Sequence, residues 1–252
     1  MKFDRYILLL ILLILWQGLS SLKVIPTPLL PSPVKIFLGL KDLLVIGMPP
    51  GHLLPNHILY SLYRVALGFF GAVLLGVPVG LLMGASHRLR RIVNPLVELI
   101  RPIPPLAWIP IAILWFGIGM KSAAFIIFLG AFFPIVLNTV SGVLAINPIY
   151  FEAAQTLNAK KKDIFFKVLI PGAIPSIFVG MRIGVGIGWM TLVAAEFTGV
   201  RTGYGLGYMI MTARDIQRPD EILAGMLVIG LIGYLINAGL KACERTFVKW
   251  RV

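Results

Sequence analysis

The chain has 252 residues, of which 58% are hydrophobic and only 13% are charged, and its mean hydropathy is +0.93. Soluble domains carry about 25% charged residues, so this composition excludes an ordinary soluble domain. A secreted disulfide scaffold is excluded as well, because Cys243 is the only cysteine. The formal charge of +13 does not indicate nucleic-acid binding, because the basic residues lie between apolar runs rather than in one stripe.

Six apolar runs approach the roughly 20 residues that a helix needs to cross the hydrocarbon core of a membrane. We therefore predict an all-α membrane protein with about six transmembrane helices in a single domain, residues 1–252. The predicted spans are residues 6–22, 58–84, about 99–118, 123–146, 173–195 and 222–240. Residues 58–240 form the predicted core of five spans, residues 1–57 add the first span and an outer segment, and residues 241–252 form a tail.

The basic residues predict the orientation of these spans, because positively charged loops stay on the cytoplasmic side. With a cytoplasmic N-terminus, the inner segments include the basic clusters at residues 88–91, 160–167 and 241–251. Both termini are therefore predicted to be cytoplasmic. The first run follows Lys2 and Arg5 and so also resembles a signal peptide, but residues 17–21 offer no convincing cleavage site. We predict a retained span, with cleavage as the alternative.

Two outer segments connect these spans. The first is rich in proline and contains a short amphipathic stretch, residues 33–45, which predicts a helix lying on the membrane surface. The second, residues 197–221, is predicted to be a loop that is rich in glycine and then mixed in charge.

Small residues recur at four-residue spacing in the second and fifth spans. They are Gly68, Ala72, Gly76, Gly80 and Gly84 in the second, and Gly180, Gly184 and Gly188 in the fifth. Such faces let helix backbones approach closely in a membrane. The pattern predicts tight packing within one chain, with a subunit interface or a moving seam as the alternative.

The third run is irregular because Pro102, Pro104, Pro105 and Pro110 remove backbone donors. Broken backbone at membrane depth survives only where it is buried in protein or lines a water-filled cavity. Alternatively, residues 92–103 lie at the cytoplasmic interface and the span begins at Pro104. The depth of Arg101 differs between the two interpretations.

Charged residues fall within or beside the apolar runs at Arg64, Glu98, Arg101, Arg182 and Glu196. A charge inside a membrane segment is a functional hypothesis by default. Snorkelling or a local ion pair is a sufficient explanation for Arg64 and Arg182. Glu196 lies near the outer end of its span, where it could line the mouth of a pathway. We expect it to serve gating or docking rather than solute binding.

The inner loop at residues 147–171 carries strong local signals. Asn147 followed by Pro148 is typical of a helix start, with a capping side chain and a proline at the first helical position. Asn158 is a plausible helix end, because asparagine tolerates the left-handed cap conformation. A second short helix follows and is predicted to end at Pro171. Two short helices that meet at a cap form a rigid projection, which suits docking to another protein better than it suits chemistry. An ordinary basic loop that fixes topology is the alternative.

The same loop resembles the EAA loop of ABC importer permeases, with the pattern E-A-A, three residues, G, nine residues, I-x-L-P. The match consists of EAA at 152–154, Asn158 in place of glycine, and VLIP at 168–171, where Val168 and Ile170 also depart from the pattern. RPIPPLAWIP at 101–110, WFGIG at 115–119, Arg182, VAAE at 193–196 and GYGLG at 203–207 are similar to the nitrate/sulfonate/taurine-type branch. The terminal Glu244-Arg245 and Trp250-Arg251 extend the match, which covers about residues 58–252.

This resemblance implies the type I ABC importer transmembrane fold in a prokaryotic inner membrane. It implies a homodimer whose EAA loops are held by two cytoplasmic ATPase subunits, with an extracytoplasmic binding protein that delivers the solute. It assigns ATPase coupling to the loop residues Tyr150, Phe151, Glu152, Ala153, Ala154, Leu157, Asn158 and Pro171. Tyr150, Phe151, Ala153 and Ala154 would enter a groove on the ATPase. Arg101, Arg182 and Glu196 are candidates for the pathway or a gate.

The chain is not expected to be an enzyme or to bind a cofactor or metal, since ATP and Mg²⁺ would be used by the partner ATPase. No G-x-x-x-x-G-K-[ST] motif occurs in it. A self-contained secondary carrier or channel is the alternative. An intramembrane enzyme is disfavoured, because the three histidines lie in loops or at span boundaries and only one cysteine is present. The branch suggests a small anion such as nitrate, a sulfonate or taurine, or bicarbonate.

Overall fold

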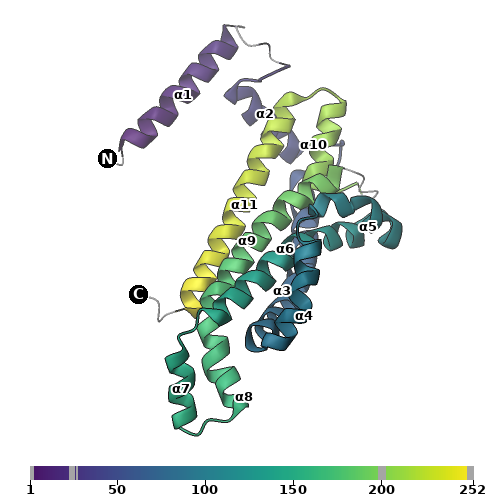
Figure 1. The fold of residues 1–252 in the computed structure, drawn as a ribbon. Coiled ribbons are helices and arrows are strands. Elements are labelled where there is room, and N and C mark those ends of the chain that lie inside the picture. Colours follow the sequence, from purple (N-terminus) through teal and green to yellow (C-terminus); the bar gives the residue numbers. More distant parts are fainter. Residues whose placement is uncertain (1–2, 23–25, 27, 198–202, 249–252) are drawn as a thin grey trace. The chain divides into compact units, whose positions relative to one another are not determined.

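The computed structural model describes residues 3–22, 26, 28–197 and 203–248, and every regular element among them is helical. The predicted all-α class is confirmed. Figure 1 shows the elements, in which η1 is a 3₁₀ turn and η2 a π-helical turn. They are α1 (Phe3–Ser21), α2 (Pro33–Val45), α3 (Leu54–Ala85), α4 (His87–Ile100), η1 (Pro105–Trp108), α5 (Ile109–Phe116), α6 (Met120–Leu144), α7 (Pro148–Thr156), α8 (Lys161–Ile164), η2 (Phe165–Leu169), α9 (Ile170–Phe197), α10 (Leu206–Asp215) and α11 (Pro219–Phe247).

Among the residues that the structure describes, four helices are long and apolar enough to cross a membrane. They are α3, α6, the continuous helix Lys161–Phe197 and α11, and a fifth span is possible if α4 and the helices after it count as one broken pair. The predicted first span corresponds to α1, whose apolar stretch Leu10–Ser21 is shorter than these helices. Its retention as a span stays a prediction.

The predicted third span, about residues 99–118, is broken, as its prolines predict. Helix α4 ends at Ile100, and Pro105–Phe116 continues at an angle of 83° to it. The second helix has a length of only about 18 Å at about 1.5 Å per residue, so a span beginning at Pro104 is too short by itself. Prolines 102, 104 and 105 remove the backbone donors that a straight helix would need here.

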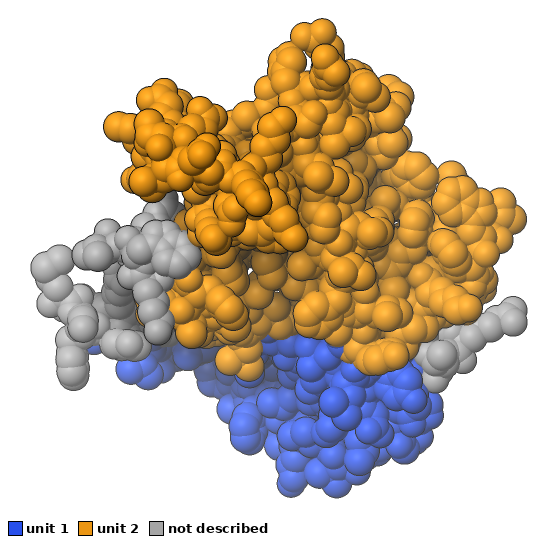
Figure 2. Space-filling model, turned by 90° about the horizontal axis from the view of Figure 1, so that it is seen from below, with its two compact units in different colours: residues 1–62, 196–232 blue, residues 63–195, 233–252 orange. Residues whose placement is uncertain are grey.

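The contacts divide the chain into two compact units, which Figure 2 colours separately. Unit 1 consists of residues 1–62 and 196–232, and unit 2 consists of residues 63–195 and 233–252. The sequence predicts one domain, and its long helices α3, α9 and α11 each contribute residues to both units.

In unit 2, the small residues of α3 pack directly on α6. A Cβ atom added to Gly80 would lie 2.5 Å from the Cβ of Thr139, and one added to Gly84 would lie 2.5 Å from the Cβ of Val143. Both distances are far below van der Waals contact, so only glycine allows this approach. The predicted packing within one chain is confirmed for this face.

The glycines of α9 pack on α6 as well. An added Cβ would lie 2.9 Å from Asn138 Cβ at Gly180, and 2.9 Å from the carbonyl oxygen of Ala131 at Gly184. Helix α6 therefore has close glycine contacts with both α3 and α9, and more than half of its apolar window is buried. This part of the chain forms a tightly packed helical framework.

In unit 1, the helix predicted at residues 33–45 is present as α2, with the expected bounds, and its position on the membrane surface stays a prediction. Ser32 caps it by accepting a hydrogen bond from the backbone N–H of Lys35 at 3.3 Å. The predicted loop at residues 197–221 is wrong in part, because residues 206–215 form helix α10. This helix is only ten residues long and follows three glycines, so its apolar pattern is too short to stand out.

Candidate functional site

Helix α7 begins and ends at the two asparagines that the sequence singles out. Asn147 caps its start, since the side-chain Oδ1 accepts a hydrogen bond from the N–H of Ile149 at 3.0 Å, and Pro148 occupies the first helical position. Asn158 follows its end with a φ of 57°. The N–H of Asn158 donates to Gln155 O at 2.9 Å, and the N–H of Ala159 donates to Ala154 O at 3.0 Å. These two bonds form a Schellman cap, which confirms the predicted cap conformation.

The projection formed by α7, the turn and α8 is held to unit 2 by aromatic side chains. In Figure 1, α7 and α8 extend beyond the ends of α6 and α9. Phe151 and Phe165 are half-buried against a cluster of Leu81, Val143, Leu169, Ala173 and Ile177. Because Phe151 packs inward, it contributes to the anchoring of the projection.

Other apolar side chains of the projection are exposed. Tyr150 is 62% exposed and Leu157 83% exposed, and Glu152 and Ala153 are exposed as well. An exposed apolar patch with polar surroundings is typical of a protein-interaction site. The anchored base and the apolar tip together suit a docking element.

Pro171 does not end the second helix, which corrects the prediction. The helix runs without interruption from Lys161 to Phe197. A π-helical turn, Phe165–Leu169, precedes the proline. This wider turn accommodates a residue that lacks an N–H and whose ring crowds the preceding turn of a regular α-helix. The projection is therefore continuous with α9.

Of the charged pathway candidates, Arg182 has a local ion pair. Its Nη1 lies 3.3 Å from Glu244 Oε2, near the end of α11. The ion-pair interpretation of Arg182 is confirmed. Snorkelling does not describe Arg64, which is completely buried.

Glu196 is 1% exposed and binds two neighbouring segments of unit 1. The hydroxyl of Ser61 donates to its carboxylate at 2.8 Å, and the N–H of Gly207 donates to it at 2.8 Å. Ser61 Oγ also accepts from the N–H of Leu206 at 2.9 Å. The first N–H groups of α10 are thus capped by side chains from α3 and α9, which α10 needs because Gly205 precedes it.

Arg101 follows the last residue of α4, and its exposed side chain lines a cavity of about 330 Å³ in unit 2. The cavity walls come from the segment after α4, from α6 and from α9. Of the three pathway candidates, Arg101 is thus the one placed on this cavity. Arg182 and Glu196 are held by other residues.

The family model of the binding-protein-dependent transport system inner membrane component matches residues 76–249, which include the projection. The chain belongs to this family.

Curated relatives of this permease family cover most of the chain. The taurine transport system permease protein TauC of Escherichia coli is 40% identical over 95% of this chain and 86% of its own length. A sulfonate permease of Bacillus subtilis, the putative SsuC, is 37% identical over 96% and 85%. A putative ABC transporter permease of Methanocaldococcus jannaschii is 47% identical over 69% of this chain, and the match spans 64% of that relative's length.

The fold agrees with a solved permease structure. A chain of the MetNI methionine ABC transporter, in an inward-facing conformation, matches with a TM-score of 0.68 over 77% of this chain and 96% of that chain. The identity is 23%, so this likeness concerns the fold. The permease therefore has the type I ABC importer transmembrane fold that the sequence predicts.

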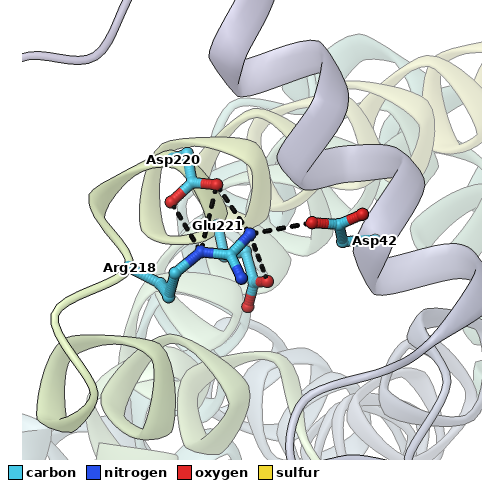
Figure 3. A network of polar contacts seen from close by, with 4 residues as sticks. All are labelled: Asp42, Arg218, Asp220 and Glu221. Carbon is cyan, nitrogen blue, oxygen red and sulfur yellow. Dashed lines mark hydrogen bonds and ion pairs between the residues drawn. The ribbon is translucent and has the colours of Figure 1, made fainter.

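A charged network in unit 1 of this permease was missed by sequence reasoning. Figure 3 shows the guanidinium of Arg218 among Asp42, Asp220 and Glu221. Its Nη2 lies 2.8 Å from Asp42 Oδ2, 2.8 Å from Asp220 Oδ2 and 2.9 Å from Glu221 Oε1. The hydrogen bonds with Asp220, first of all, and with Asp42, together with the negative charge of Glu221, raise the pKa of Arg218 above its usual value. The network ties α2 to the start of α11.

Ser61 and His57 were also missed. His57 is completely buried, and its Nδ1 accepts a hydrogen bond from the N–H of Gly205 at 3.0 Å. Both residues lie in the first turns of α3 and cap a segment almost 150 residues away. The sequence offers no signal for this pairing beyond the presence of polar residues in an apolar helix.

Proposed function

We propose that this chain is the membrane-spanning permease subunit of an ATP-binding-cassette importer. It forms the translocation pathway as a homodimer. Two separate cytoplasmic ATPase subunits use ATP and Mg²⁺ to drive transport, and an extracytoplasmic binding protein delivers the solute. In this proposal the chain itself is no enzyme and binds no cofactor. The family membership and the type I fold support the assignment.

The capped projection of α7 and α8 is the observation that carries the coupling role. It is short, closed by a Schellman cap at Asn158 and anchored through Phe151 and Phe165. Because this element is rigid and continuous with α9, a force applied to the element would move α9. A flexible loop would deform instead. Tyr150, Glu152, Ala153, Ala154 and Leu157 would form the contact with the ATPase, and Asn158 and Pro171 would shape the element.

The carried solute is a small anion in this proposal. The named relatives include permeases for taurine, aliphatic sulfonates and nitrate. We place the chain in a prokaryotic inner membrane with both termini in the cytoplasm. This orientation puts the basic projection on the inner side, as the positive-inside rule requires.

Reconstitution tests this proposal. The permease is placed in proteoliposomes with its ATPase and binding protein, and uptake and ATP hydrolysis are measured for nitrate, taurine, alkanesulfonates and bicarbonate. We expect uptake only when all three components and ATP are present, and one class of anion to stimulate hydrolysis. Solute accumulation by the permease alone would instead identify a self-contained carrier.

Glu196 serves gating or docking in this proposal, because its carboxylate caps α10. The Glu196→Gln variant keeps the shape and one acceptor oxygen but loses the charge. We expect lower uptake with an unchanged order of preference among solutes, measured in the same proteoliposomes. An altered solute preference with normal coupling to ATP hydrolysis would assign Glu196 to binding instead.

A further inference from the structure

The cavity beside Arg101 combines a few polar side chains with a mostly apolar wall. Its polar side chains are those of Arg101, Trp108 and Asn138. The remaining wall is apolar and is formed mainly by six large side chains: Ile103, Leu129, Phe133, Leu137, Ile183 and Ile187. Among the described residues, no carboxylate lines it. The cavity thus offers one cation, one amide and one indole N–H along an otherwise apolar wall.

The position of the cavity explains the broken third span. Arg101 and Ile103 belong to the non-helical segment between α4 and η1, and both line the cavity. Backbone without helical hydrogen bonds is tolerated at membrane depth where it lines a cavity. Gly130 and Asn138 place the cavity about 15–27 Å from the Met120 end of α6, at about 1.5 Å per residue. The cavity therefore lies beside the middle and the inner part of α6, which is about 37 Å long.

Arg101 has a charge available for a ligand. Within the described residues, its guanidinium has no hydrogen-bond or ion-pair partner, whereas Arg182 and Arg218 are both neutralised by carboxylates. Arginine remains protonated and presents a planar set of donors that fits the oxygens of a carboxylate or sulfonate.

Asn138 can supply a further donor on the same wall. One N–H of its amide donates to the carbonyl oxygen of Pro134 at 2.8 Å. A primary amide has two N–H groups, so the second can donate to an anion in the cavity.

We propose that this cavity is a subsite, within the permease, for an organic oxyanion with an apolar group, such as an alkanesulfonate or arenesulfonate. The inference rests on the proposed function and narrows its substrate class. Arg101 and Asn138 bind the oxygens, and the apolar wall contacts the hydrocarbon part. Nitrate has no hydrocarbon part, so it would lose its hydration without gaining contacts with the apolar wall. The ammonium group of taurine would have no carboxylate to bind among the lining residues.

A fluorescence experiment tests the subsite directly. The full permease, assembled with its ATPase in lipid nanodiscs without nucleotide, is titrated with 4-iodobenzenesulfonate, whose iodine quenches a nearby indole. The part of the quenching that disappears in the Trp108→Phe variant is the signal from the cavity. Butanesulfonate, taurine and nitrate are then added as competitors at equal concentrations.

Substitutions of Arg101 identify the charge that binds. We expect Arg101→Gln to weaken binding of the probe at least about tenfold, as for the loss of a charged hydrogen bond, and Arg101→Lys to lie between this variant and the unsubstituted chain. Arg88→Gln is the matched control, because Arg88 is an exposed arginine of α4 that does not line the cavity. It should bind like the unsubstituted chain. Equal binding by Arg101→Gln and the unsubstituted chain would overturn the proposal.

The competitors separate the possible ligands. We expect butanesulfonate to displace the probe and taurine and nitrate to do so poorly. Displacement by nitrate as strong as that by butanesulfonate would overturn the inference, and so would stronger displacement by dihexanoyl phosphatidylglycerol, which would identify a lipid site. ATP-dependent uptake is measured separately. A complex that transports but does not bind the probe refutes the subsite alone, while a chain without ATP-dependent transport refutes the proposed function.

Discussion

Asn158 turns the chain between α7 and α8 with a left-handed backbone. At its φ of 57°, a residue with an unbranched polar side chain or glycine is accepted, whereas a β-branched residue is strained. The two bonds of the Schellman cap depend on this conformation. The turn between α7 and α8 thus depends on this backbone angle.

We predict that Asn158→Gly retains uptake and that Asn158→Val reduces it severalfold. Valine in the left-handed region costs about 1–2 kcal/mol, which favours another turn and tilts α7. Uptake per molecule of ATP hydrolysed in proteoliposomes is the measurement, and the thermal midpoint in detergent shows whether the effect stays local. Normal coupling in Asn158→Val would show that the angle is irrelevant to function.

Residues also show how much of this structure the sequence determines. Asn147, Pro148 and Asn158 act on backbone groups only a few positions away, so their roles could be predicted. The pairing of Asp42 with Arg218 joins residues 176 positions apart, and no local pattern selects one acidic partner over another. The same holds for the capping of α10 by Ser61 and Glu196, where the cap and the helix lie on different elements.

At the scale of elements, α6 is the helix against which others pack. Four-residue spacing of glycine predicts a close helix contact but names no partner, and the structure identifies α6 as the partner of both α3 and α9. The prolines after α4 likewise predict a break in the helix, but not the angle between the two helices. A missing N–H ends the first helix, and the direction of the next helix is then determined by packing.

The contact between α3 and α6 predicts that Gly80→Ala is destabilising. The new methyl group would overlap Thr139, and overpacking of this kind costs about 1–3 kcal/mol. Gly186→Ala in α9 is the matched control, because nothing lies within 4 Å of its added Cβ. Thermal unfolding of the purified permease should show a lower midpoint for Gly80→Ala only. Equal midpoints for the two variants would mean that α3 and α6 are not packed this closely.

The charged network that links α2 to α11 predicts that loss of the Arg218 charge weakens the link more than loss of the Asp42 charge. Arg218→Gln leaves the carboxylate of Glu221, which is 3% exposed, without its cation, whereas Asp42→Asn leaves Arg218 paired with Asp220 and Glu221. Removal of one partner from a buried pair is the costlier change. Limited proteolysis at residues 46–52 should therefore accelerate more in Arg218→Gln than in Asp42→Asn. Equal rates would indicate that Arg218 does not hold α2.

At the scale of the whole molecule, a single element, the projection, connects the ATPase to the membrane pathway in the proposed importer. The projection is stiff, because it is capped at both ends of α7, and it is continuous with α9. Helix α9 in turn packs on α6 and contributes Ile183 and Ile187 to the cavity beside Arg101. A displacement of the projection would therefore be transmitted through the packed helices α9 and α6 to the wall of the cavity.

The central claim is that the tip of the projection contacts the ATPase during transport. A photo-crosslinking amino acid is placed at Leu157, which is 83% exposed, or at Leu114 of α5, which is 81% exposed and serves as control. Both variants are reconstituted with the ATPase and binding protein, and crosslinks and uptake are measured in the same vesicles. The account predicts capture of the ATPase from position 157 and not from position 114. Full uptake without capture at 157, or with α7 and its cap deleted, would contradict it.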